Sequence, residues 1–96
     1  MSLKSPMHPG EFVKELYMVP FGISSERMAN ALSVSPSAFS RFINGKSDLS
    51  IDMAFRLSIV IGRSVESWMN MQNNFDMQKY RENEQEKLAS LRPLVF

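Results

Sequence analysis

The sequence has no cysteine among its 96 residues, which excludes a disulfide framework and a thiolate metal site. It has no apolar run near the roughly 18 to 20 residues that a membrane-spanning helix needs. No secretory signal is visible either, so we expect a cytoplasmic protein without a membrane partner. The hydrophobic content of 44% still suffices for a packed core, and the length suits one small domain.

Signs of catalysis or metal binding are also missing. The single histidine, His8, has Glu11 nearby, which falls short of the three or four ligands of a metal site. There is no glycine-rich phosphate loop, and no nucleophile, base and orienting acid occur in a recognisable arrangement. We therefore expect no enzymatic activity, no metal and no cofactor. The eight methionines fit core packing better than a soft-metal site, since three lie on predicted core stripes: Met28, Met53 and Met71.

The net charge of +1 is too small to indicate nucleic-acid binding by itself, but the distribution of charge is uneven. The stretch 27–47 contains only basic charges, whereas acids gather in the stretch 82–86. Two interpretations fit this pattern: a locally positive patch on a nearly neutral molecule, or ordinary surface cations. The basic residues are Arg27, Arg41 and Lys46.

Apolar spacing and capping residues predict five short helices and no strand. The first opens at 8–11 with His-Pro-Gly-Glu, and serines stand at the N-cap positions of the other four. The predicted caps are Ser24, Ser35, Ser50 and Ser64. The predicted apolar stripes are Phe12, Val13, Leu16 and Tyr17; Met28, Ala29 and Leu32; Phe39, Phe42 and Ile43; Met53, Ala54, Leu57 and Ile61; and Trp68, Met71, Gln72 and Phe75.

The fourth predicted helix carries a second apolar stripe, formed by Ile51, Phe55 and Ile59 at a spacing of four. A helix that is apolar on two faces is usually buried on two sides. The second side meets either the fifth helix or a second chain, and we favour the fifth helix.

Residues 24–46 have the pattern of a helix-turn-helix, in which a brace helix precedes a helix aimed at the DNA major groove. Ala29 supplies the small side chain required where the two helices approach. Ser33 stands where glycine is usual, and a positive φ there costs roughly 1 kcal/mol. A plain helical hairpin is the alternative. We predict binding to double-stranded DNA without chemistry on it.

The outward residues of the third helix and its flanks are the expected DNA contacts. Arg41 can donate two hydrogen bonds to guanine, and Asn44 can pair with adenine or a phosphate. Lys46 and Ser25 are better placed for backbone phosphates. The full predicted set is Ser25, Ser35, Pro36, Ser37, Ser40, Arg41, Asn44 and Lys46.

In these motifs the chain resembles the HigA/VapI-type antitoxins of the XRE, lambda-repressor-like helix-turn-helix superfamily. The segments that carry the resemblance are HPGE at 8–11, GIS at 22–24, the run 28–46, SIDMAFRL at 50–57 and 64–77. The resemblance implies an all-α, five-helix lambda-repressor-like domain with a C-terminal helix extension. In that family Arg56-Leu57 and Trp68 belong to the scaffold, and Arg27 replaces an acidic residue common at its position.

The resemblance also implies function and partners. The protein is expected to bind a palindromic operator as a homodimer and to repress its own operon. Its expected protein partner is a HigB-like, mRNA-cleaving toxin, which it neutralises. An orphan regulator of the same fold fits the sequence too, as does a toxin-neutralising interaction module with vestigial DNA binding.

We expect three segments along the chain. Residues 1–7 are a flexible start or a cloning remnant, residues 8–78 are the helix-turn-helix domain, and residues 79–96 are a charged tail. The tail is a solvated helix end, a segment that a partner orders, or disordered. The apolar stretch 91–96 either docks back on the domain or binds a partner.

Overall fold

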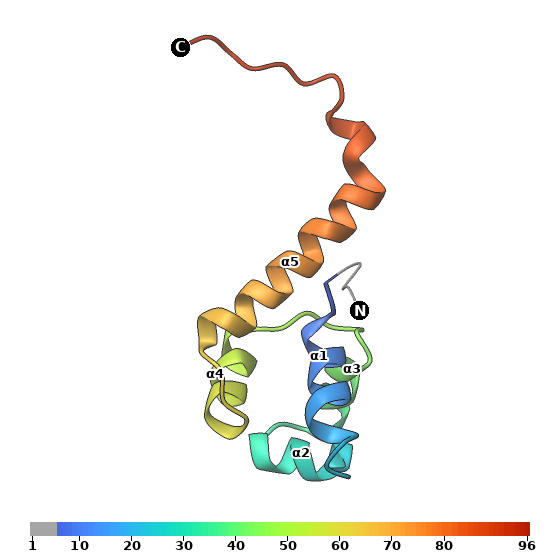
Figure 1. The fold of residues 1–96 in the computed structure, drawn as a ribbon, viewed down its shortest axis with the longest axis vertical. Coiled ribbons are helices and arrows are strands. Elements are labelled where there is room, and N and C mark those ends of the chain that lie inside the picture. Colours follow the sequence, from blue (N-terminus) through green and yellow to red (C-terminus); the bar gives the residue numbers. More distant parts are fainter. Residues whose placement is uncertain (1–5) are drawn as a thin grey trace.

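The computed structural model describes residues 6–96, in which short helices surround a small core and one long helix projects away (Figure 1). The described residues form no strand, which agrees with the predicted all-α, five-helix fold and its C-terminal extension. The elements are α1 (Pro9–Val13), the π-helical turn η1 (Lys14–Met18), α2 (Ser25–Leu32), α3 (Pro36–Ile43), α4 (Ile51–Val60), α5 (Val65–Glu84) and the 3-10 turn η2 (Gln85–Leu88). Among these residues no helix combines the length and apolarity needed to cross a bilayer. Residues 1–5 of the predicted flexible start lie outside the described residues.

Serine side chains cap four of the helices, as predicted. Each serine oxygen accepts a hydrogen bond from the backbone N–H three residues later and so satisfies one of the helix's free donors. The four bonds join Ser24 to Arg27 at 3.1 Å, Ser35 to Ala38 at 3.1 Å, Ser50 to Met53 at 3.0 Å and Ser64 to Ser67 at 2.9 Å. Each such cap typically contributes about 1 kcal/mol.

The His-Pro-Gly segment fixes the start of α1 against α3. His8 Nδ1 accepts the Gly10 N–H at 2.9 Å, so Nε2 carries the ring proton and donates to the Ser47 carbonyl at 3.0 Å. Gly10 lies so close to α3 that a Cβ there would sit 1.9 Å from the Phe42 carbonyl oxygen. The predicted role of His8-Pro9 in starting the helix is confirmed.

A π-helical turn changes which residues of the first helix face the core. The Val19 N–H donates to the Lys14 carbonyl five residues earlier, at 3.0 Å, which adds one residue to the turn. The inward position after Val13 is therefore Met18, which is 5% exposed. The prediction that Leu16 shares the apolar stripe is wrong, because the extra residue leaves it 47% exposed.

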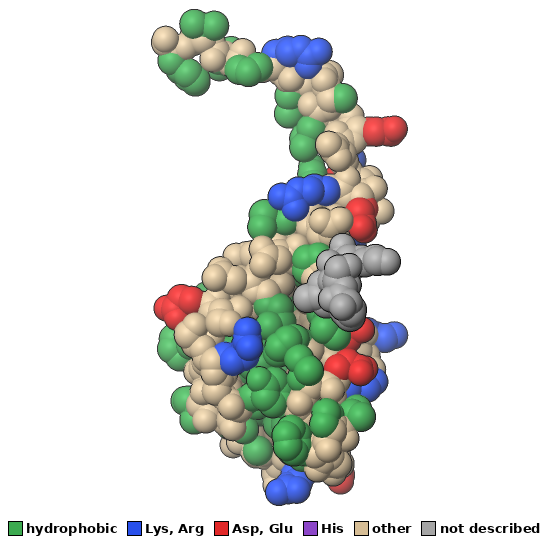
Figure 2. All heavy atoms as spheres, in the orientation of Figure 1, with side chains coloured by type: hydrophobic (Ala, Val, Ile, Leu, Met, Phe, Trp, Pro, Cys, Tyr) green, Lys and Arg blue, Asp and Glu red, His purple; other side chains and the backbone are tan. Residues whose placement is uncertain are grey.

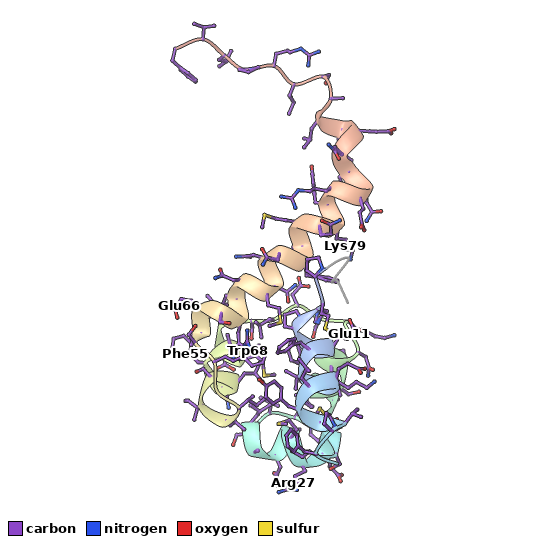
Figure 3. The ribbon with its side chains drawn as sticks, viewed as in Figure 1. Glu11, Arg27, Phe55, Glu66, Trp68 and Lys79 are labelled. Carbon is purple, nitrogen blue, oxygen red and sulfur yellow. The ribbon has the colours of Figure 1, made fainter. Side chains whose placement is uncertain are left out.

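Trp68, near the start of α5, lies in the core between α4 and α1 (Figure 3). Its ring is fully buried, its Nε1 donates to the Gly62 carbonyl at 2.8 Å, and Phe12 meets it edge to face at 5.9 Å. The other predicted stripes are confirmed as buried or partly buried, including the three methionines. The remaining buried apolar residues are Val13, Met18, Met28, Ala29, Leu32, Phe39, Phe42, Ile43, Leu49, Met53, Ala54 and Leu57.

The second stripe of α4 is not covered by α5, so that prediction is wrong. Ile51, Phe55 and Ile59 are 64%, 55% and 82% exposed, and Phe55 lies on the outer side of α4 (Figure 3). The reason lies in the anchoring of α5, where buried Gln72 accepts the Leu49 N–H at 2.7 Å. Trp68 of α5 is also fully buried in the core, so α5 packs on the core-facing side of α4 and leaves the second stripe uncovered.

Only the first part of α5 packs on the domain, and the rest projects into solvent (Figure 1). The helix passes residue 78, the predicted domain boundary, without a break and ends at Glu84. Beyond η2 the apolar residues of the stretch 91–96 are exposed, so this stretch does not dock back on the domain.

Candidate nucleic-acid interface

The turn between α2 and α3 is closed by backbone hydrogen bonds. The Val34 N–H donates to the Ala29 carbonyl at 3.0 Å, and the Ser33 N–H donates to the Asn30 carbonyl at 3.1 Å. Ser33 has φ 56° and ψ 46°, the left-handed conformation predicted from its position. Ala29 is fully buried, as the close approach of the helices requires.

A side chain from α4 completes this turn. Arg56 Nη1 donates to the carbonyls of Leu32 and Ser33 at 2.9 and 3.2 Å, and its Nε donates to Asp52 at 2.8 Å. The guanidinium thereby satisfies carbonyls at the end of α2 that have no partner within the helix.

The third helix has a buried face and a solvent face. Phe39, Phe42 and Ile43 lie in the core, whereas Ser37 and Arg41 are exposed. The starts of α2 and α3 border one depression, and the predicted contacts on α3 and in the turn after it are at least partly accessible; these segments form the helix-turn-helix surface. Of the predicted set, Ser35, Pro36, Ser37, Arg41, Asn44 and Lys46 are exposed, and Ser25 and Ser40 are half-buried.

The side chains of three predicted contacts are already engaged in hydrogen bonds: Ser35, Ser40 and Asn44. Ser35 Oγ caps α3, and Asn44 Nδ2 donates to the Ser40 carbonyl at 2.9 Å and to Ser40 Oγ at 3.4 Å. The Asn44 amide must therefore change rotamer before it can pair with a base.

The cations of this surface are not neutralised by neighbouring carboxylates. Among residues 6–96 the salt bridges are Asp52–Arg56 and Glu84–Lys87, so neither Arg41 nor Lys46 is paired there. Backbone geometry also fixes Lys46, whose N–H donates to the Arg41 carbonyl at 2.8 Å beside Gly45 at φ 73°. The two positive charges lie at the last turn of α3 and just past its end.

The family model described as helix-turn-helix matches residues 13–68, which is more than half of the chain and includes α2, α3 and α4. The chain belongs to this helix-turn-helix family.

Two relatives share sequence with this helix-turn-helix protein over most of their length. Virulence-associated protein I of Dichelobacter nodosus is 35% identical over 88 residues, 92% of this chain and 81% of the relative. Antitoxin HigA-1 of Vibrio cholerae is 32% identical over 91 residues, 95% of this chain and 86% of the relative.

Solved structures of similar proteins include DNA complexes. Antitoxin GraA in complex with its operator is 31% identical with a TM-score of 0.86, and the match covers all of this chain and 98% of that one. Pseudomonas aeruginosa antitoxin HigA with the higBA promoter is 31% identical with a TM-score of 0.83, and the match covers 94% of this chain and 99% of that one.

Residues outside the predicted set of contacts also line the surface of this helix-turn-helix protein. Arg27 and Asn30, together with the acidic Glu26, border a depression of about 460 Å³ between the starts of α2 and α3, and Arg27 extends from the outer side of α2 (Figure 3). The signal was present, since Arg27 belongs to the basic stretch. The sequence pattern places Arg27 in that stretch but does not include it among the predicted DNA contacts.

The face of the domain seen in Figure 2 carries an apolar patch. Hydrophobic side chains gather there between α4 and α1, while Lys and Arg side chains are scattered singly (Figure 2). An apolar groove also lies between the end of α4 and the α1–α2 segment, lined by Tyr17, Phe21, Ile23, Arg27, Met28, Ala31, Val60 and Ile61. The helix-turn-helix surface is thus the better candidate for a polyanion.

Proposed function

We propose that this protein is a sequence-specific, DNA-binding transcriptional regulator that acts in the cytoplasm. In this proposal it is the antitoxin of a type II HigBA-like pair and represses its own operon. The observation that carries the proposal is the exposed, unpaired Arg41 on the solvent face of α3. The fold around it is shared with antitoxins solved together with operator or promoter DNA.

Each residue of the surface has a role in this proposal. Arg41 donates two hydrogen bonds to a guanine edge, and Ser37, Ser40 and Asn44 make further polar contacts in the major groove. Lys46 and Ser25 bind backbone phosphates. The start of α3 adds the Ser37 N–H, because Pro36 has no N–H and Ser35 occupies that of Ala38.

We further propose that two copies bind a palindromic operator as a homodimer. The support is the uncovered apolar stripe of α4, since three exposed aliphatic and aromatic residues on one helix face are typical of an interaction site. A dimer would set its two α3 helices about 34 Å apart, one turn of duplex. The DNA-binding unit would then span residues 8–78, with the charged segment 79–96 left to a toxin partner.

Gel shifts on the gene's own promoter, over a series of salt concentrations, test the DNA contacts. Arg41→Ala should lose about 1–3 kcal/mol of specific binding and relax the base preference. Lys46→Ala should weaken binding to all sequences and lower the salt slope by about one unit. Lys79→Ala is the matched control, because it removes one charge from α5 away from α3 (Figure 3). Equal operator affinity for Arg41→Ala and wild type would exclude the base contact.

A second function is favoured by one observation, the net charge of only +1 with a single cation on the outer side of α3. In this alternative the protein mainly neutralises a toxin and its DNA binding is vestigial. Co-purification with a small basic protein from the neighbouring gene, without operator binding at moderate salt, would support it. Operator binding without such a neighbouring gene would support an orphan regulator.

A further inference from the structure

We infer that Arg56 is a positioning residue for sequence-specific DNA recognition. Its guanidinium holds the left-handed turn between α2 and α3 and so sets the angle at which α3 meets the major groove. The inference rests on the DNA binding proposed above, and it assigns to one α4 side chain the control of specificity rather than of general affinity.

The contacts of Arg56 span three parts of the fold. Its Nη1 bonds the Leu32 carbonyl at the end of α2 and the Ser33 carbonyl in the turn, while Asp52 holds Nε from the preceding turn of α4. A charged guanidinium donates stronger hydrogen bonds than a neutral group, and its planar shape fixes their direction; the two bonds to the turn measure 2.9 and 3.2 Å. The turn is therefore tied to α4 in one geometry.

The turn needs such a tie because its backbone is strained. Ser33 has a Cβ and yet lies at φ 56°, a conformation that glycine adopts far more easily. Without the two carbonyl bonds the turn can relax, and α3 begins only three residues later, at Pro36. Any change of angle at the turn therefore carries Ser37 and Arg41 with it.

A change of angle affects base contacts more than phosphate contacts. Hydrogen bonds to base edges require side chains at fixed positions in the groove, whereas attraction to phosphates acts over several ångströms and tolerates displacement. Loss of the Arg56 bonds should lower the affinity for the operator and leave binding to unrelated duplex almost unchanged.

The test compares Arg56→Met with Arg81→Met, which removes the same charge from an exposed position on α5. Dissociation constants are measured for the promoter duplex and for an unrelated duplex of equal length, at a temperature where circular dichroism shows each variant folded. Arg56→Met should bind the promoter about tenfold more weakly and the unrelated duplex within about twofold of wild type. Arg81→Met should keep the wild-type ratio.

A rescue variant separates positioning from general destabilisation. Ser33→Gly removes the strain, so adding it to Arg56→Met should restore most of the promoter preference, while in the wild-type background it should leave that preference unchanged. If Arg56→Met does not fold, Arg56→Lys takes its place, since lysine keeps the charge but can reach fewer acceptors. It should lose about threefold in promoter affinity.

The possible failures are distinct. If wild type itself does not prefer the promoter, the proposed function fails and the recognition role of Arg56 with it. If wild type prefers the promoter and Arg56→Met prefers it equally, or Ser33→Gly does not rescue, only the role of Arg56 is overturned.

Discussion

At the scale of single residues, two glycines show two different reasons why a position disfavours a side chain. Gly10 has no room for a Cβ, because the α3 backbone fills the space that a methyl group would occupy. Gly22 has φ 62°, but nothing lies within 4 Å of the place where its Cβ would be. The two glycines are therefore required for different reasons, one for contact and one for conformation.

Alanine at these two positions should consequently differ in effect. Gly10→Ala must push α1 away from the Phe42 carbonyl, and we expect a loss of about 3 kcal/mol or more in the free energy of unfolding. Gly22→Ala adds only backbone strain, about 1 kcal/mol. Urea unfolding followed by circular dichroism measures both. Equal stabilities for the two variants would mean that α1 and α3 are not in contact at Gly10.

At the scale of elements, features that depend on residues close in the sequence could be predicted, whereas features that depend on distant residues could not. The serine caps of α2 to α5 were predictable because each bond closes within three residues. The bonds from Arg56 to the Leu32 carbonyl and from the Leu49 N–H to Gln72 join residues more than 20 positions apart, so no local pattern indicates them. The second stripe of α4 was visible in the sequence, but periodicity does not say what covers a face, and α5 packs elsewhere.

The sequence pattern does not reveal the π-helical turn either. A period of 3.6 residues places Leu16 on the face of Val13, and only the folded structure reveals the inserted residue that brings Met18 inward instead. The exposed positions of α3 could be predicted, since they lie opposite its apolar stripe. The bonds of the Asn44 amide depend on a rotamer, which no sequence pattern specifies.

The π-helical turn makes a pair of substitutions diagnostic. Met18→Ala should destabilise the protein by about 2–4 kcal/mol because it opens a cavity beside Val13. Leu16→Ala removes a half-exposed side chain and should cost under about 1 kcal/mol. Thermal or urea unfolding of both variants provides the comparison. If Leu16→Ala proved more destabilising than Met18→Ala, the first helix would be regular, as its sequence pattern predicts, and would lack the π-helical turn.

At the scale of the whole molecule, the uncovered stripe of α4 determines the expected assembly. Ile59 is 82% exposed, and water-exposed apolar residues of this kind are removed from solvent when a second copy binds. The monomer core does not depend on Ile59, so a charge there should change association without unfolding the domain.

Sedimentation of Ile59→Glu tests this expectation. Wild type should sediment as a dimer at tens of micromolar, and Ile59→Glu should shift to the monomer and bind the promoter with lower apparent affinity. Val95→Glu is the control, because Val95 is also apolar and is 98% exposed on the extended segment. A wild type that stays monomeric, or a Val95→Glu variant that dissociates equally, would contradict a dimer through α4.

The projecting half of α5 is structurally independent of the rest of the molecule. The helix has 20 residues and is therefore about 30 Å long, yet past Gln78 it adds nothing to the core or to the α3 surface. Substitutions past Gln78 should therefore change neither the stability of the core nor the choice of DNA sequence. A chimera in which a foreign segment replaces this part of the helix should keep the promoter preference of the parent that supplied the domain.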